Sequence, residues 1–207
     1  MKRILLTTLL LLAVFPLAAC DDNNPVPRQS EGRTLQERRS LVVYASRTGN
    51  TERLARLLQK TLGCDIIMVE PTTPYDADYN AMLERSQREL DAIRRGDFPP
   101  IRTTVEDLDN YDTIYIGYPI WYGSIATPMQ TFLHTHSAML AGKHVALFAT
   151  SGSSGIANTI RESQRLCPKA TIIDNTLLIT SSMQTSMTER LAAWLEEIGA
   201  AREDTDK

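Results

Sequence analysis

Short apolar runs typical of buried strands alternate with amphipathic helical patterns along most of this 207-residue chain. Parallel strands need long crossover connections, and a helix between successive strands supplies them. The alternation therefore predicts a doubly wound α/β fold, in which helices cover both faces of a five-stranded parallel sheet. The runs that we expect to form its strands are residues 41–44, 66–69, 113–117, 145–150 and 176–179.

The first helical pattern has clear core-facing and terminal signals. Leu54, Leu57, Leu58 and Leu62 recur at the spacing of one helical face. Gly63 follows them, where a left-handed helix cap usually stands. These signals predict an amphipathic helix that ends at Leu62.

Four further segments are expected to be helical. A longer, more polar helix is predicted at about 79–95, and others at 156–166 and 187–198. Between them, Thr127 is expected to cap a helix that has Pro128 at its first position.

The loop between the first strand and the first helix consists of Ser46, Arg47, Thr48, Gly49, Asn50 and Thr51. Backbone N–H groups at the start of a helix lack helical partners, and the helix dipole places partial positive charge there. Hydroxyl groups add neutral donors, and glycine lets the backbone approach a ligand. These properties suit a phosphate group. An ordinary helix N-terminal turn is the alternative.

Two further loops are expected at the same edge of the sheet. In open parallel sheets, ligands bind outside the carboxyl ends of the strands, and residues 118–125 and 151–155 follow two of those ends. The first loop reads Tyr-Pro-Ile-Trp-Tyr-Gly-Ser-Ile, and the second contains only serine and glycine. Because three unusual loops meet at one edge, the sequence predicts a binding site there.

The first nineteen residues have the features of a bacterial signal peptide. Lys2 and Arg3 precede an apolar stretch from Ile4 to Phe15, which is too short to span a membrane. Residues 17–20, Leu-Ala-Ala-Cys, resemble a lipobox, with cleavage before Cys20 and lipidation of its thiol. A plain signal peptide with an incidental cysteine is the alternative.

A lipidated Cys20 would anchor the protein on the extracytoplasmic side of the cell envelope. Asp21 resembles the signal that keeps such proteins in the inner membrane of enteric-type bacteria, so we expect the periplasmic face of that membrane. Residues 20–39 are rich in charge and poor in apolar side chains, which is typical of a flexible tether. We assign residues 40–200 to one domain and 201–207 to a polar tail.

Charge and cysteine spacing exclude several classes of site. Loss of residues 1–19 removes two positive charges, Lys2 and Arg3, and takes the formal net charge from −3 to −5. A mildly acidic chain without a basic run argues against nucleic acid as a partner. No Cys, His and carboxylate cluster has metal-site spacing. Cys64 and Cys167 are expected roughly 19 Å apart, at about 4.8 Å per strand, which excludes a disulfide.

Residues 41–199 together resemble a flavodoxin-family domain. The loop at 46–51 matches the family pattern of hydroxyl, any residue, Thr, Gly, any residue, Thr, and the stretch Gly-Tyr-Pro-Ile-Trp-Tyr-Gly at 117–123 is the most specific part of the match. The resemblance implies strand order 2-1-3-4-5 and FMN as the cofactor. In this family the first loop surrounds the phosphate, and the other two flank the isoalloxazine ring.

The resemblance carries a set of cofactor-binding residues onto the three loops. They are Ser46, Arg47, Thr48, Gly49, Asn50 and Thr51 for the phosphate; Pro119, Ile120, Trp121, Tyr122, Gly123 and Ser124 in the second loop; and Thr150, Ser151, Gly152, Ser153 and Gly155 in the third. Trp121 is the preferred stacking residue because its large π-face suits a flat tricycle. Trp194, on an apolar helical face, is assigned to the core. Gly123 is expected to be the peptide hinge beside the flavin.

Three functions fit these features. The first is an FMN redox protein that transfers electrons in the cell envelope, with a partner protein or a membrane donor. The second is an FMN-dependent NAD(P)H quinone or nitro reductase. The third loop carries no aromatic residue to cover the ring, which favours the reductase, but pyridine nucleotides are scarce outside the cytoplasm. The third is a flavin-free binding lipoprotein. We favour the first.

Overall fold

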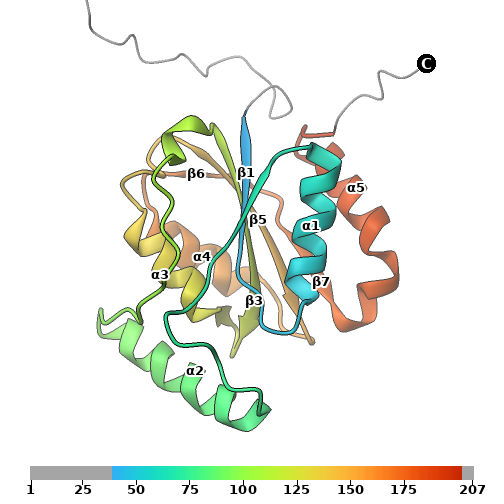
Figure 1. The fold of residues 1–207 in the computed structure, drawn as a ribbon. Coiled ribbons are helices and arrows are strands. Elements are labelled where there is room, and N and C mark those ends of the chain that lie inside the picture. Colours follow the sequence, from blue (N-terminus) through green and yellow to red (C-terminus); the bar gives the residue numbers. More distant parts are fainter. Residues whose placement is uncertain (1–38, 202–207) are drawn as a thin grey trace, which may run out of the picture.

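The computed structural model describes residues 39–201, which form a three-layer α/β domain (Figure 1). Helices α1 (Asn50–Leu62) and α5 (Met187–Glu197) cover one face of the sheet, and α3 (Thr127–Thr135) and α4 (Ala157–Leu166) cover the other. Helix α2 (Tyr79–Arg94) instead lies beyond the carboxyl ends of the strands, beside α3. The predicted α/β fold with helices on both faces is confirmed.

The parallel strands follow the predicted spatial order. They run β2, β1, β3, β5, and the last place beside β5 is shared by β6 and β7. β6 pairs with the start of β5 and β7 with its end, so the fifth strand of the predicted order 2-1-3-4-5 is split in two. The strands are β1 (Ser40–Tyr44), β2 (Asp65–Met68), β3 (Thr113–Trp121), β4 (Ser124–Ile125), β5 (His144–Ser151), β6 (Thr171–Ile172) and β7 (Leu177–Thr180).

Side chains of the central strands alternate between two apolar cores, one on each face of the sheet. In β1, Leu41 and Val43 belong to the core beneath α3 and α4, whereas Val42 and Tyr44 belong to the core beneath α1 and α5. Because both faces are buried, apolar side chains are favoured at every position, and such strands read as continuous apolar runs. Trp194 packs in the α1–α5 core, as predicted, and its Nε1 donates to the Asn175 carbonyl at 2.8 Å.

The ends of two helices test the capping predictions. α1 ends as expected, with Gly63 in the left-handed conformation at φ 58°. The prediction for α3 is wrong by one position, because Ala126 is the N-cap and Thr127 is the first helical residue. The Thr127 hydroxyl donates instead to Glu89 of α2, at 2.5 Å. Two 3₁₀ helices, η2 (Leu108–Asn110) and η3 (Ser181–Ser186), complete the described elements.

Strand β3 continues past the predicted strand and into the segment that the sequence assigned to a loop. Ile120 pairs with Ile125 and Trp121 with Ser124, both antiparallel. Most of residues 118–125 therefore form a β-hairpin, and Tyr122 and Gly123 are its turn. The prediction of a loop was wrong here because Pro119, which has no backbone N–H, interrupted the strand pattern.

Close packing between β3 and β5 requires a glycine. Gly117 is the register partner of Phe148. A Cβ atom at position 117 would lie 2.2 Å from Cζ of Phe148, whose side chain is fully buried. The ring therefore occupies the space that a side chain at 117 would need.

The predicted signal peptide, the lipidated Cys20, the tether as far as residue 38 and the tail from residue 202 lie outside the described residues. Between residues 39 and 201, no helix is both long enough and apolar enough to cross a membrane. Cys64 and Cys167 form no disulfide with each other; Cys167 is buried and Cys64 is partly exposed.

Candidate functional site

A pocket of about 580 Å³ opens at the carboxyl edge of the sheet, where the sequence predicted a binding site. Its walls come from all three predicted loops and from α2. The predicted site residues that line it are Ser46, Arg47, Thr48, Asn50, Thr51, Pro119, Ile120, Trp121, Tyr122, Thr150, Ser151, Gly152 and Ser153. Gly49, Gly123, Ser124 and Gly155 are not among its lining residues.

The first loop presents the start of α1 to this pocket. Gly49 is the N-cap of α1, in the left-handed conformation at φ 82°, and no side chain of residues 39–201 caps the helix by a hydrogen bond. The first backbone N–H groups of a thirteen-residue helix therefore face outward together with the positive end of its dipole. Ser46 Oγ is buried and has no hydrogen-bond partner within residues 39–201. Such a group is costly unless a ligand satisfies it.

Arg47 joins this loop to the start of α2. Its Nη2 atom donates to the carbonyl oxygens of Asp76 and Ala77, each at 2.9 Å, and more weakly to that of Asp78 at 3.4 Å. The side chain still lines the pocket. It therefore supplies positive charge beside the pocket, while its hydrogen bonds hold the backbone of residues 76–78 in place.

Hydroxyl groups connect the first and third loops. Thr51 Oγ1 and Thr150 Oγ1 are 2.8 Å apart and both residues are buried. Within the third loop, Ser151 Oγ donates to the Ser154 carbonyl at 2.8 Å. These bonds fix the spacing of two walls of the pocket.

Helix α4 holds the β3–β4 hairpin in place. Tyr122 and Gly123 have φ angles of 50° and 75°, the paired positive values of a type I′ turn. Asn158 Nδ2 donates to the Gly123 carbonyl at 3.0 Å. Glu162 accepts from the backbone N–H of Ile125 at 2.9 Å and from Asn158 at 3.2 Å. The Gly123 carbonyl thus faces α4, and the turn presents Tyr122 to the pocket with 54% of its surface exposed.

A half-buried carboxylate, that of Glu89, holds Tyr75, whose ring contacts Trp121. Glu89 accepts hydrogen bonds from the hydroxyls of Tyr75 and Thr127 and pairs with Arg85 Nε at 2.7 Å. The Arg85 guanidinium also lies over the Tyr75 ring, 4.1 Å from its centroid. Burial, followed by the hydrogen bond to Glu89, raises the pKa of Tyr75, so the phenol stays a neutral donor.

Sequence reasoning missed part of the pocket. The lining also includes Tyr79, Met82 and Leu83 of α2, together with Ser154, Ser181 and Gln184. The apolar spacing of α2 indicated a helix packed on the sheet and did not show that the helix lies across the carboxyl ends of the strands. The side chain of Asp78 caps α2 by accepting a hydrogen bond from the Ala81 N–H at 2.8 Å. An aspartate at this position was the sequence signal for the start of the helix that forms this wall.

The family model described as Flavodoxin matches residues 39–198. This span includes every strand and helix given above. It also includes the three loops and the segment of α2 that line the pocket.

Among curated proteins, this chain is similar to Flavodoxin 1 of Salmonella typhimurium and to Flavodoxin 1 of Escherichia coli, with 30% identity over 109 residues in each case. Each alignment covers 52% of this chain and 46% of the relative. The chain therefore spans about half the length of the curated relatives that it matches.

Among solved structures, a candidate flavoprotein of Bacteroides eggerthii is 32% identical, with a TM-score of 0.65, over 78% of this chain and 98% of that one. A flavoprotein of Lactobacillus acidophilus, solved in complex with FMN, is 25% identical, with a TM-score of 0.59. That similarity covers 73% of this chain and 99% of the other.

Proposed function

Because the chain belongs to the flavodoxin family, we propose that it binds FMN in the pocket at the carboxyl edge of the sheet and acts as a redox protein of the cell envelope. The observation that carries the proposal is the buried Ser46 Oγ beside the start of α1, because in the described part of the chain this oxygen has no hydrogen-bond partner and the helix has no side-chain cap. A phosphate group would satisfy both features at once. The flavoprotein of Lactobacillus acidophilus solved with FMN supports the choice of cofactor.

The first loop would hold the phosphate end. Ser46, Thr48 and Asn50 line this part of the pocket and supply side-chain donors. Thr51 is bonded to Thr150, so its part is to fix the two loops relative to each other. Arg47 contributes positive charge near the phosphate, and its hydrogen bonds fix the position of the loop relative to the segment that precedes α2.

The ring end would lie among aromatic and apolar side chains. Trp121 and Tyr122 border the pocket from the hairpin, and Tyr79, 61% exposed, borders it from α2. Large aromatic faces from different elements suit a flat ring system. Bound FMN would supply reversible one- and two-electron chemistry, while the side chains position the ring and limit its contact with water.

Expression of Ser40–Lys207 tests the cofactor directly. The proposal expects a yellow protein that has the absorption spectrum of FMN and releases FMN on denaturation. A colourless, folded protein that fails to bind added FMN would contradict it and would favour the flavin-free binding lipoprotein.

Addition of NADH or NADPH to the yellow protein separates the two redox alternatives. An electron carrier should keep its flavin oxidised until a suitable protein or membrane donor is present. Rapid bleaching by NAD(P)H would favour the quinone or nitro reductase instead.

The envelope location rests on the lipobox-like residues before Cys20 and is tested with the full chain. We expect wild-type protein to incorporate labelled palmitate and to sediment with membranes. Cys20→Ala should lose both properties. Unchanged sedimentation and labelling of this variant would contradict lipidation at Cys20.

A further inference from the structure

A second, smaller cavity lies next to the proposed cofactor pocket. Its volume is about 230 Å³, and it is bounded by the carboxyl ends of β1 and β2, the segment at 71–75 and the end of β3. It shares Ser46, Arg47, Pro119 and Trp121 with the larger pocket, and its other lining residues are its own. The indole of Trp121 is therefore a wall of both cavities.

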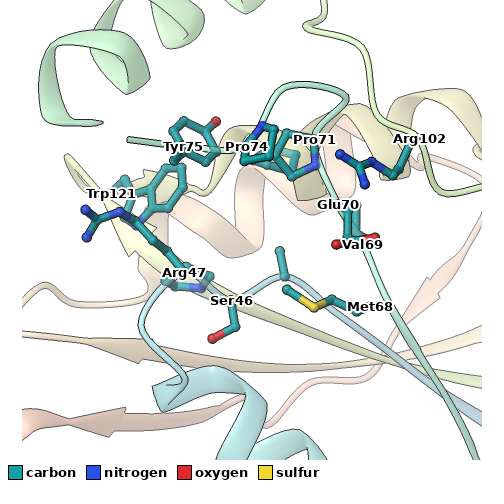
Figure 2. Close-up of a pocket in the computed structure, with 13 residues that line it drawn as sticks. Ser46, Arg47, Met68, Val69, Glu70, Pro71, Pro74, Tyr75, Arg102 and Trp121 are labelled. Carbon is teal, nitrogen blue, oxygen red and sulfur yellow. The ribbon is translucent and has the colours of Figure 1, made fainter. Parts of the chain in front are cut away.

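The inner walls of this second cavity are apolar and rigid. Pro71 and Pro74 form one side, and Trp121 and Tyr75 meet at one end (Figure 2). Tyr75 is fixed by its hydrogen bond to Glu89, and the proline rings have restricted backbone angles. A cavity with fixed walls is largely preformed, so a ligand loses less free energy to ordering of the protein.

Polar side chains gather at the opposite end. Figure 2 shows Arg102 and Glu70 there, away from Trp121. Within residues 39–201, the Arg102 side chain makes one hydrogen bond, from Nη2 to the Thr72 carbonyl at 3.2 Å. A guanidinium has five N–H donors, so Arg102 can donate to a ligand as well. The Glu70 carboxylate at the same end offsets the positive charge of Arg102, so this end of the cavity has no net charge that would favour an anionic ligand.

The cavities share two polar residues, Ser46 and Arg47, and the polar groups of both point away from the second cavity. In Figure 2 the Ser46 hydroxyl points away from the centre of the second cavity, and the Arg47 guanidinium lies beyond Trp121. Arg47 is also bonded to the carbonyls of Asp76 and Ala77. The end of the second cavity at Trp121 is therefore an aromatic surface, and the polar contacts come from the end at Arg102.

We propose that this second cavity binds a neutral, single-ring aromatic compound that carries a carbonyl group. The ring packs against Trp121 and Tyr75, and the carbonyl oxygen accepts a hydrogen bond from Arg102. The volume lies below the roughly 300–1,000 Å³ of sites for drug-sized ligands, which suits one ring and not a dinucleotide. The proposal rests on the cavity and does not depend on FMN binding.

Binding can be followed at the indole N–H signals of the ¹⁵N-labelled full chain. The sequence has two tryptophans, Trp121 and Trp194, and Trp194 lies in the core beneath α1 and α5. Trp121→Phe assigns the two signals. Benzamide should shift the Trp121 signal and leave that of Trp194 in place. Benzoate, which has nearly the same shape but a negative charge, should bind no more tightly, because Glu70 offsets the charge of Arg102 and burial removes water from the carboxylate.

Arg102→Met tests the polar contact, and Arg165→Met is the matched control because both arginines are exposed. Arg102→Met should weaken benzamide binding about tenfold, and Arg165→Met should not change it. Equal affinity in the two variants, tighter binding of benzoate or no shift at Trp121 would overturn the proposal.

FMN distinguishes this cavity from the larger pocket. Saturation of the protein with FMN should leave the benzamide shift at Trp121 in place. Loss of the shift on FMN addition would place benzamide in the larger pocket and overturn the proposal. If the protein fails to bind FMN, the proposed function fails, and the titrations without FMN still decide whether the second cavity binds the ring.

Discussion

The rings of Tyr75 and Trp121 meet nearly at right angles, with an interplanar angle of 80° and centroids 5.0 Å apart. Tyr75 precedes α2, whereas Trp121 ends β3, so this contact joins two segments that are distant in the sequence. An edge-to-face pair is favourable by about 0.5–1.5 kcal/mol beyond burial of its area. Since Tyr75 is itself held by Glu89, the orientation of the Trp121 indole depends on a carboxylate in α2.

Glu89→Gln should destabilise the domain by about 1–3 kcal/mol, because it weakens the bonds to Tyr75 and Thr127 and leaves Arg85 without its carboxylate partner. Urea unfolding measures the change, and near-ultraviolet circular dichroism reports the setting of Trp121. Glu84→Gln is the control. Its pair with Arg88 is long, at 3.9 Å, and exposed, so its loss should have little effect. Similar stability of the two variants would contradict a structural role for Glu89.

Ser46→Ala should weaken FMN binding without destabilising the free protein. Without FMN, removal of a buried hydroxyl that has no partner within the described residues should leave the free energy of unfolding unchanged or raise it by about 1 kcal/mol. With FMN, loss of a donor to the phosphate should weaken binding about tenfold. Fluorescence titration measures the FMN affinity, and Ser137→Ala, near the far end of α3, is the control. Unchanged FMN affinity in Ser46→Ala would show that this hydroxyl does not bind the phosphate.

Gly117→Ala should destabilise the domain by about 1–3 kcal/mol, because the new methyl group would overlap the buried Phe148 ring. Gly155→Ala is the matched control, since a Cβ atom there meets no atom of the described residues within 4 Å and its backbone needs no left-handed angle. Thermal unfolding compares the two variants. Equal melting temperatures would mean that β3 and β5 can separate at little cost.

Alkaline pH should destabilise the domain in part through Cys167. Burial raises the pKa of this thiol from its ordinary value of 9.0 to about 11. The unfolded state therefore releases its proton first. The contribution of Cys167 is present below pH 9 and is lost as the pH rises to 11, by an amount on the order of 2–3 kcal/mol.

Cys167→Ala should remove that part of the pH dependence, as measured by urea unfolding between pH 8 and pH 11. Tyr118, whose pKa burial raises to about 12, is present in both proteins and cancels in the comparison. Parallel stability curves for wild type and Cys167→Ala would show that the buried thiol does not contribute.

The sequence predicted those parts of the fold that follow from local patterns. The apolar run at β1 and the leucine stripe ending at Gly63 each determine one element, and their order along the chain implies a parallel sheet. The meeting of residues 46–51, 118–125 and 151–155 at one edge also follows from this order, because parallel strands place their carboxyl ends there. Thr51 and Thr150 thus come together although 99 positions separate them.

What the sequence did not predict depends on tertiary contacts. The helical pattern of α2 does not state which surface the helix covers, so Tyr79 and Leu83 were missed as pocket residues. The pairing of Trp121 with Ser124 exists only once β3 extends past the sheet. Thr127 is a residue type that often caps helices, but its hydroxyl donates a hydrogen bond to Glu89. Glu89 comes near Thr127 only because of where α2 lies in the folded domain.

The division of the last strand position between β6 and β7 has a consequence for self-association. A long, continuous edge strand offers a row of unpaired N–H and C=O groups to which another chain can add. At this edge the described strands are only two and four residues long, and β2 at the opposite edge has four. Neither edge therefore provides a long template for an incoming strand, and the broken edge protects the folded domain against growth of the sheet from one molecule into the next.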